Sequence, residues 1–249
     1  MEIIRRPFVV LWKLYFFLSF ILLLLVAYPL YMYFLRKRSS FPMAFALVKA
    51  QATFLSYITG VFLIVKGKSN FPKKPYVLVS NHSSYFDILL MYALVPEYFV
   101  FMGKAELEQW PLFNIFFTKG MNIAVARGSL SGARKAYERA NDELQRGNSL
   151  VIFPEATIPE DVPNMLKFKV GAFKLAVEHQ VPIVPVTFTR NYKILQNGGF
   201  LKAPAGPGLA PAIVHKPIET RGMGEDDILP LLNKTFEIVK SALPDYENR

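Results

Sequence analysis

The chain has 249 residues, 52% of them hydrophobic and 14% aromatic, with 29 Lys and Arg against 19 Asp and Glu. This length has room for one α/β domain and a membrane-associated segment, and the apolar content is high for a wholly soluble protein. Residues 1–68 hold nine basic residues and one acidic residue, and this concentration of positive charge indicates an anionic membrane surface as partner and not a nucleic acid. The chain contains no cysteine, which excludes disulfides.

The first predicted element is a hydrophobic helix over 14–35. These 22 residues contain no charge, and basic residues stand on both sides at Arg5, Arg6, Lys13 and 36–38. A helix of this length spans roughly 33 Å, enough for the hydrocarbon core of a bilayer. A cleaved signal peptide is the alternative, but such peptides have a shorter apolar core and a small-residue cleavage site. We therefore predict an uncleaved membrane segment.

A second helix is predicted over 43–65, where apolar residues recur at spacings of three and four. Lys49, Thr53, Ser56 and Gly60 form the opposite, more polar stripe. Because basic residues flank both helices, the charge pattern leaves open two crossings of the bilayer or a hairpin within one leaflet. We predict that residues 1–68 form a membrane-anchoring two-helix segment and that residues 69–249 form a separate domain.

From residue 69 onward, predicted strands alternate with predicted helices. The strands are expected at 76–80, 99–102, 123–126, 150–153, 183–188 and 212–215, and the helices at 131–146, 170–179 and 227–242. This alternation predicts an α/β fold with a mixed sheet flanked by helices. Candidate functional residues lie at strand exits, where α/β folds place their chemistry.

The strongest chemical signal is the pair His82 and Asp87, which follows directly after the strand predicted at 76–80. A neutral imidazole accepts a proton from a hydroxyl, and a carboxylate bonded to its other ring nitrogen fixes its tautomer and orientation. No Gly-x-Ser-x-Gly motif and no cysteine supply a covalent nucleophile. The sequence therefore predicts a general base, His82, that acts directly on a substrate hydroxyl and is oriented by Asp87.

Metal chemistry has no recognisable motif in the chain. The two other histidines, His179 and His215, show no HxxxH, HExxH or Cys/His spacing. We interpret both as structural, and we predict no metal and no resident cofactor.

Further blocks follow in order: Lys104-Ala-Glu-Leu, Gly120-Met-Asn-Ile-Ala-Val-Ala-Arg127, Val151-Ile-Phe-Pro-Glu-Ala-Thr157 and Val181-Pro-Ile-Val-Pro-Val. With the His-x4-Asp block, these resemble the glycerolipid acyltransferases, and most closely the bacterial 1-acyl-glycerol-3-phosphate acyltransferases, from about residue 71 to 217. The resemblance implies that His82 and Asp87 are catalytic. It also implies that Arg127 contacts the acceptor's phosphate and that Glu155 and Thr157 line the acceptor site, with Lys104 a further candidate.

The third block departs from the family pattern Phe-Pro-Glu-Gly-Thr-Arg at two positions. Ala156 replaces the glycine and Ile158 replaces the arginine. Isoleucine offers no donors to a phosphate, whereas arginine offers a fork of them. Lys167, Lys169 and Arg190 are candidates for the missing charge. Alanine also indicates that the turn after Glu155 does not need a positive φ.

The expected activity is direct transfer of a fatty acyl chain from a thioester to the free hydroxyl of a lysophospholipid. The donor is an acyl carrier protein thioester or acyl-CoA, and the sequence does not distinguish them. The family implies the inner membrane, with the catalytic part on the cytoplasmic face. The altered third block leaves open a lyso-aminolipid acceptor, and from a different class of protein, a non-catalytic lipid-binding module stays an alternative.

Overall fold

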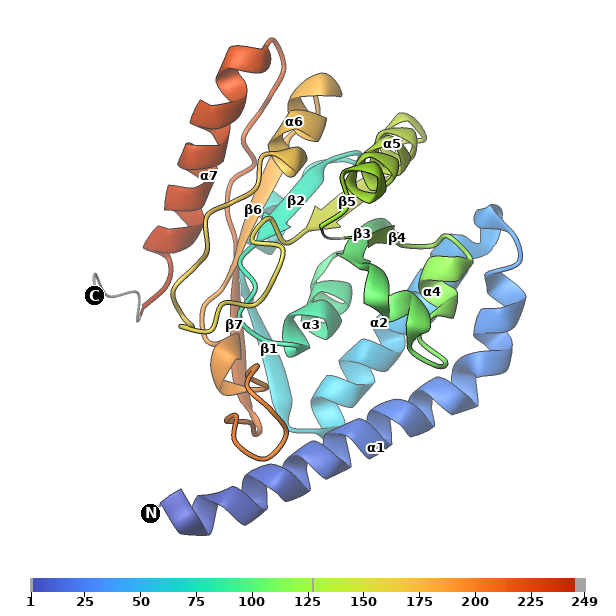
Figure 1. Ribbon diagram of the computed structural model, residues 1–249, viewed down its shortest axis with the longest axis vertical. Coiled ribbons are helices and arrows are strands. Elements are labelled where there is room, and N and C mark those ends of the chain that lie inside the picture. The colour runs from blue at the N-terminus through green and yellow to red at the C-terminus, as the bar shows by residue number, and fades with distance from the viewer. Residues whose placement is uncertain (1, 127, 245–249) are drawn as a thin grey trace.

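The computed structural model describes residues 2–126 and 128–244, and in these ranges the strands form one seven-stranded sheet (Figure 1). The strands are β1 (Val61–Lys66), β2 (Val77–Ser80), β3 (Phe99–Lys104), β4 (Ile123–Val125), β5 (Ser149–Ile152), β6 (Ile183–Phe188) and β7 (Gly208–Val214). Their order is β1-β7-β6-β2-β5-β3-β4, and the paired strands are parallel except for β6 and β7. The predicted mixed sheet is confirmed.

The central strands consist of short apolar runs without alternation. All residues of β2 and of β6 are buried, as expected for parallel strands covered on both faces. The helices are α1 (Glu2–Phe34), α2 (Phe41–Ile58), α3 (Phe86–Leu94), α4 (Ile115–Thr118), α5 (Leu130–Gln145), α6 (Gly171–Glu178) and α7 (Ile228–Ser241). Helices α5, α6 and α7 lie side by side on one face, and α2 and α3 lie on the other (Figure 1).

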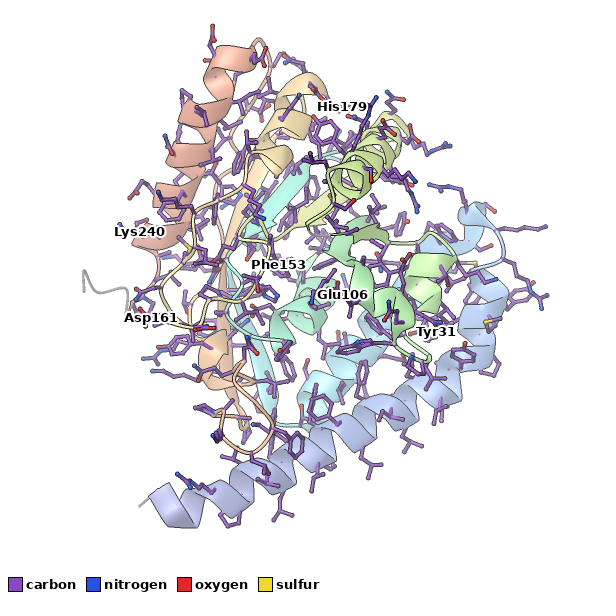
Figure 2. The ribbon with its side chains drawn as sticks, viewed as in Figure 1. Tyr31, Glu106, Phe153, Asp161, His179 and Lys240 are labelled. Atoms are coloured by element: carbon purple, nitrogen blue, oxygen red, sulfur yellow. The ribbon has the colours of Figure 1, made fainter. Side chains whose placement is uncertain are left out.

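The two N-terminal helices are each long and apolar enough to cross a membrane. Helix α1 lies along the outside of the molecule (Figure 1). It exposes many large apolar side chains. Its inner side packs on the rest of the chain: Tyr31 meets the ring of Phe116 of α4 edge to face (Figure 2), and the Trp12 indole donates to the Thr59 carbonyl. Helix α2 packs against α3. Both helices are therefore continuous with the packing of the α/β part.

The second helix ends earlier than the sequence predicts. Helix α2 stops at Ile58, not at residue 65, and 61–66 form strand β1, which pairs in parallel with β7. Gly60 causes the break, since its φ of +73° is left-handed and a Cβ built there would lie 2.9 Å from the Cβ of Pro207. From Val61 onward burial alternates along the chain, as in a strand with one exposed face. The sheet thus begins inside the segment predicted as an anchor, while the domain division at residue 68 stays a prediction.

Lys13 is not an exposed flanking charge but a buried one, with 2% of its surface exposed. Its Nζ donates to the carbonyl oxygens of Phe200 and Ala203, each at 2.6 Å, and to that of Gly199 at 3.3 Å. Hydrogen bonds from a charged donor are about twice as strong as neutral ones. Lys13 therefore fastens the first third of α1 to the loop between β6 and β7.

We expect Lys13→Met to lower the free energy of unfolding by about 2–4 kcal/mol, because three carbonyl groups lose a charged donor. Thermal unfolding in detergent measures this loss as a lower Tm. The matched control is Lys37→Met, since Lys37 is exposed in the turn after α1. Equal melting temperatures for the two variants would contradict the role given to Lys13.

Candidate active site

The loop between β2 and α3 brings His82 and Asp87 together. His82 Nδ1 lies 3.0 Å from Asp87 Oδ2, and the same oxygen accepts the backbone N–H groups of Ser83 at 2.7 Å and Ser84 at 2.9 Å. Asp87 is fully buried, whereas 12% of the His82 side chain is exposed. Three donors converging on one oxygen match a carboxylate acceptor, so Nδ1 carries the proton. The imidazole then presents Nε2 as the free acceptor, as a general base requires.

Phe153 fixes the imidazole from a second direction. Its ring stacks on that of His82, with the ring centroids 4.1 Å apart and the ring planes parallel to within 4°. Phe153 follows β5, the neighbour of β2 in the sheet, and lies near the centre of the molecule beside α3 (Figure 2). The sequence interpretation quoted this residue only as part of the Phe-Pro-Glu block. The ring's contact with His82 identifies it as a further residue of the site.

Glu155 lies next to the site but is fully engaged with the backbone. It is 3% exposed, and its two oxygens accept the N–H groups of His82 and Leu166, both at 2.7 Å. The bond with His82 joins the loop after β2 to the loop after β5, and the bond with Leu166 closes the latter loop on itself. Both carboxyl oxygens of Glu155 thus hold the backbone of the site in place, while the expectation that Glu155 lines the acceptor site stays a prediction.

Burial raises the pKa of Glu155 from 4.5 to about 8, although the N–H donors of His82 and Leu166 act in the opposite direction. Between pH 4.5 and about 8, the Glu155 carboxyl therefore binds its proton more tightly in the folded protein than in the unfolded chain. The stabilisation from this group is complete below pH 4.5 and is lost as the pH rises through about 8.

We expect wild type to be more stable than Glu155→Gln at about pH 5. The difference in their free energies of unfolding should shrink as the pH rises to about 8, by at most about 1.4 kcal/mol per pH unit, and the difference in Tm should shrink with it. Melting curves at several pH values measure the trend. Glu138→Gln is the control, because it makes the same change in an exposed side chain that forms an ion pair with Arg134. A difference that is constant or grows with pH would contradict the assignment.

Lys104 and Thr157 lie at the same edge of the sheet as the His–Asp pair. Parallel strands β2, β5, β3 and β4 are neighbours, so their carboxyl ends meet there. Lys104 ends β3 and is half-exposed, with its Nζ 2.9 Å from Glu106 Oε1. Thr157 is exposed just beyond β5. Arg127, which follows β4, lies outside the described residues.

The turn after Glu155 differs from its prediction. Ala156 has a φ of +66°, in the left-handed region that favours glycine. The expectation that this turn needs no positive φ is therefore wrong. The chain reverses direction in a tight turn that is closed by a hydrogen bond from the Ala156 N–H to the Phe153 carbonyl, at 3.0 Å. Ile158 is buried and Lys167, Lys169 and Arg190 are all exposed.

An apolar cavity lies between α1, α2 and α3. It has about 470 Å³ of space not filled by atoms, part of it open to solvent. Its walls include Phe20, Leu24 and Leu55 of the N-terminal helices and Ile88 and Leu89 of α3. Ile88 and Leu89 directly follow Asp87 in α3. The start of this helix therefore contributes Asp87 to the His–Asp pair and the next two residues to the wall of the cavity.

Within the described ranges, no group of three or more His, Asp or Glu side chains is arranged to hold a metal ion. His179 Nε2 lies 2.7 Å from Asn141 Oδ1, and His215 Nε2 lies 2.9 Å from Thr187 Oγ1. These contacts fit the structural roles predicted for both histidines. The absence of a metal and of a cofactor stays a prediction.

An oriented histidine at the carboxyl edge of a mixed α/β sheet can accept a proton from a hydroxyl and return it. Comparison with known families is consistent with this chemistry: the Acyltransferase family model matches residues 62–189. The chain belongs to this acyltransferase family, and the resemblance predicted from the sequence is confirmed.

Individual relatives point to one branch of the family. The chain is 32% identical over 183 residues to 1-acyl-sn-glycerol-3-phosphate acyltransferase alpha of Mus musculus, which covers 69% of this chain and 60% of the mouse protein. It is 27% identical over 197 residues to 1-acyl-sn-glycerol-3-phosphate acyltransferase of Saccharomyces cerevisiae, which covers 77% of this chain and 63% of the yeast protein. The chain thus matches about 60% of the length of these curated relatives.

The fold is also that of a solved structure. The 1-acyl-sn-glycerophosphate (LPA) acyltransferase PlsC from Thermotoga maritima superposes with a TM-score of 0.80 at 23% identity. The match covers 100% of this chain and 99% of the other. It extends over the two N-terminal helices as well as the sheet, so the whole architecture is shared.

Proposed function

We propose that the protein is a membrane-bound O-acyltransferase that transfers a fatty acyl chain from a thioester to the free hydroxyl of 1-acyl-glycerol-3-phosphate, giving phosphatidic acid. The observation that carries this proposal is the His82 imidazole, held by Asp87 on Nδ1 and by Phe153 on one face. Membership of the acyltransferase family and the names of its relatives support the reaction class.

In the proposed mechanism, His82 Nε2 accepts the proton of the lysophospholipid hydroxyl as its oxygen attacks the thioester carbonyl. A C–O bond forms, the C–S bond breaks, and the proton passes from His82 to the departing thiolate. Asp87 stabilises the imidazolium formed in between. A thioester is reactive enough that no enzyme-bound acyl intermediate is required.

The developing oxyanion needs a hydrogen-bond donor. The backbone N–H groups of residues 82–87 all donate to protein acceptors: Glu155, Asp87, Leu195 and Ser84. This favours a side-chain donor, Lys104, which is half-exposed at the end of strand β3, two positions from β2 in the sheet. We therefore assign the oxyanion contact to Lys104.

The structure supports a hairpin in one leaflet more than two crossings. Arg38, in the turn between α1 and α2, bonds to Glu143 of α5, and β1 returns the chain to the sheet directly after α2. Both ends of α2 are thus held at the α/β part, so α2 does not leave it to traverse a bilayer. We propose that the exposed face of α1 lies among the acyl chains of the lipid bilayer and that the cavity binds one acyl chain. We place the catalytic part at the cytoplasmic face of the inner membrane.

The acceptor's head group is tested by substrate choice. Purified protein is supplied with acyl carrier protein and coenzyme A thioesters, and thiol release is followed with 1-acyl-glycerol-3-phosphate, monoacylglycerol or a lyso-aminolipid. We expect kcat/KM for the phosphate-bearing acceptor to exceed that for monoacylglycerol at least about tenfold, or about 1.4 kcal/mol.

Two results would contradict this assignment. Release only with the aminolipid would move the activity to that acceptor, an outcome that the buried Ile158 makes worth testing. No release with any pair of substrates would favour the non-catalytic lipid-binding module.

A further inference from the structure

The Asp87 carboxylate has a partner on a distant part of the chain. Asn191 begins a short 3-10 helix after β6, is fully buried, and donates from Nδ2 to Asp87 Oδ1 at 2.7 Å. The other contacts of this carboxylate, from His82, Ser83 and Ser84, are all made to Oδ2. Asn191 therefore holds the one oxygen that the loop after β2 leaves without a donor among the described residues.

This contact controls the direction of the carboxylate. Rotation about the Cβ–Cγ bond of Asp87 would exchange or tilt the two oxygens and weaken the bond from His82 Nδ1. A donor fixed on Oδ1 resists that rotation. Because a carboxylate accepts only, the neighbouring amide must present its NH₂ group, which settles the orientation of Asn191.

The amide is retained at a cost to stability. Asn191 Oδ1 is buried and has no hydrogen-bond partner among the described residues. A buried acceptor without a partner is unfavourable, and an aliphatic side chain of similar size would avoid it. Packing alone therefore does not account for an asparagine here, whereas donation to Asp87 does.

The segment that carries Asn191 is itself bound along the loop after β2. The Asn81 side chain exchanges two hydrogen bonds with the backbone of Phe188, at 2.9 and 3.0 Å. The Ser84 hydroxyl and the Tyr85 N–H both donate to the Leu195 carbonyl. Asn191 thus sits on a rigid support.

We propose that Asn191 is a positioning residue for acyl transfer, acting through Asp87 on the orientation of the His82 imidazole. This inference rests on the proposed function and adds a member to its site. Because Asn191 is fully buried, its loss should affect turnover and not substrate binding.

The test compares Asn191→Ala and Asn191→Leu with Ser84→Ala in the full chain. The last variant removes two buried hydrogen bonds of the Ser84 hydroxyl, the one it donates to the Leu195 carbonyl between the same two segments and the one it accepts from the Phe86 N–H, but it keeps the Ser84 N–H and the Asn191 amide. Steady-state kinetics and Tm are measured for each. In parallel, ¹⁵N NMR of histidine-labelled protein, assigned with His82→Ala, reports which nitrogen of His82 is protonated.

We expect both Asn191 variants to lose about 10–100-fold in kcat, the range set by an acid–base residue that is misoriented and not removed, with KM changed less than about threefold. The His82 signals should show a mixture of tautomers in both. The two variants should lose kcat equally although they differ in Tm, and Ser84→Ala should keep the single tautomer. Loss of kcat in proportion to Tm in all three variants, or a single tautomer in the Asn191 variants, would overturn the proposal. If wild type transfers no acyl group, the proposed function fails while the NMR comparison still decides the role of Asn191.

Discussion

His82→Ala should lower kcat by about 10³-fold or more, because the hydroxyl loses the group that accepts its proton. The substitution should leave the fold intact, since the side chain is partly exposed and contributes one hydrogen bond and one stacked ring. Thiol release and Tm, measured on the same preparation, separate these two effects.

His179→Ala is the matched control for this prediction. It also removes one imidazole and one hydrogen bond, to Asn141, but at the end of α6. We expect it to keep activity within about twofold of wild type, as remote substitutions usually do. More than a few per cent of wild-type activity in His82→Ala would refute the base assignment.

Asp87→Asn should lower kcat by about 10³–10⁴-fold, the range seen when an amide replaces the orienting carboxylate of a catalytic histidine. The amide cannot balance the charge of the imidazolium, and its NH₂ group would meet either the N–H groups of Ser83 and Ser84 or the amide of Asn191. KM for the acceptor should change little, because Asp87 is fully buried and does not face substrate.

A kcat within about tenfold of wild type would show that Asp87 does not orient the base. Circular dichroism and Tm are needed beside the kinetics, since a donor–donor clash in the loop also destabilises the fold. Loss of structure without loss of kcat would give Asp87 a structural role.

Local patterns predicted most of the sheet. The strands at 183–188 and 99–104 and helix α5 follow from apolar runs and from spacings of three and four, and their bounds differ from the predicted ones by two residues or fewer. The sequence pattern failed at β1 because Phe62 and Val65 also continue the helical spacing of α2. Thr59 and the left-handed Gly60 separate the two elements, and the helical spacing placed that glycine on a polar helix stripe.

The site was predictable where its residues are close in sequence. His82 and Asp87 are five residues apart, so one motif contains both. Asn191 and Phe153 reach the pair only because β6 and β5 flank β2, and one sequence does not reveal the order of strands. The buried contacts of Lys13 with Phe200 and of Glu155 with His82 are likewise long-range.

One measurement tests the central claim most directly: the ratio of phosphatidic acid formed to thiol released, for wild type and His82→Ala, with an acyl thioester and 1-acyl-glycerol-3-phosphate in detergent micelles. Direct transfer that depends on His82 predicts one phosphatidic acid per thiol in wild type and neither product in the variant. Thiol release without phosphatidic acid, or equal rates in the two proteins, would contradict it.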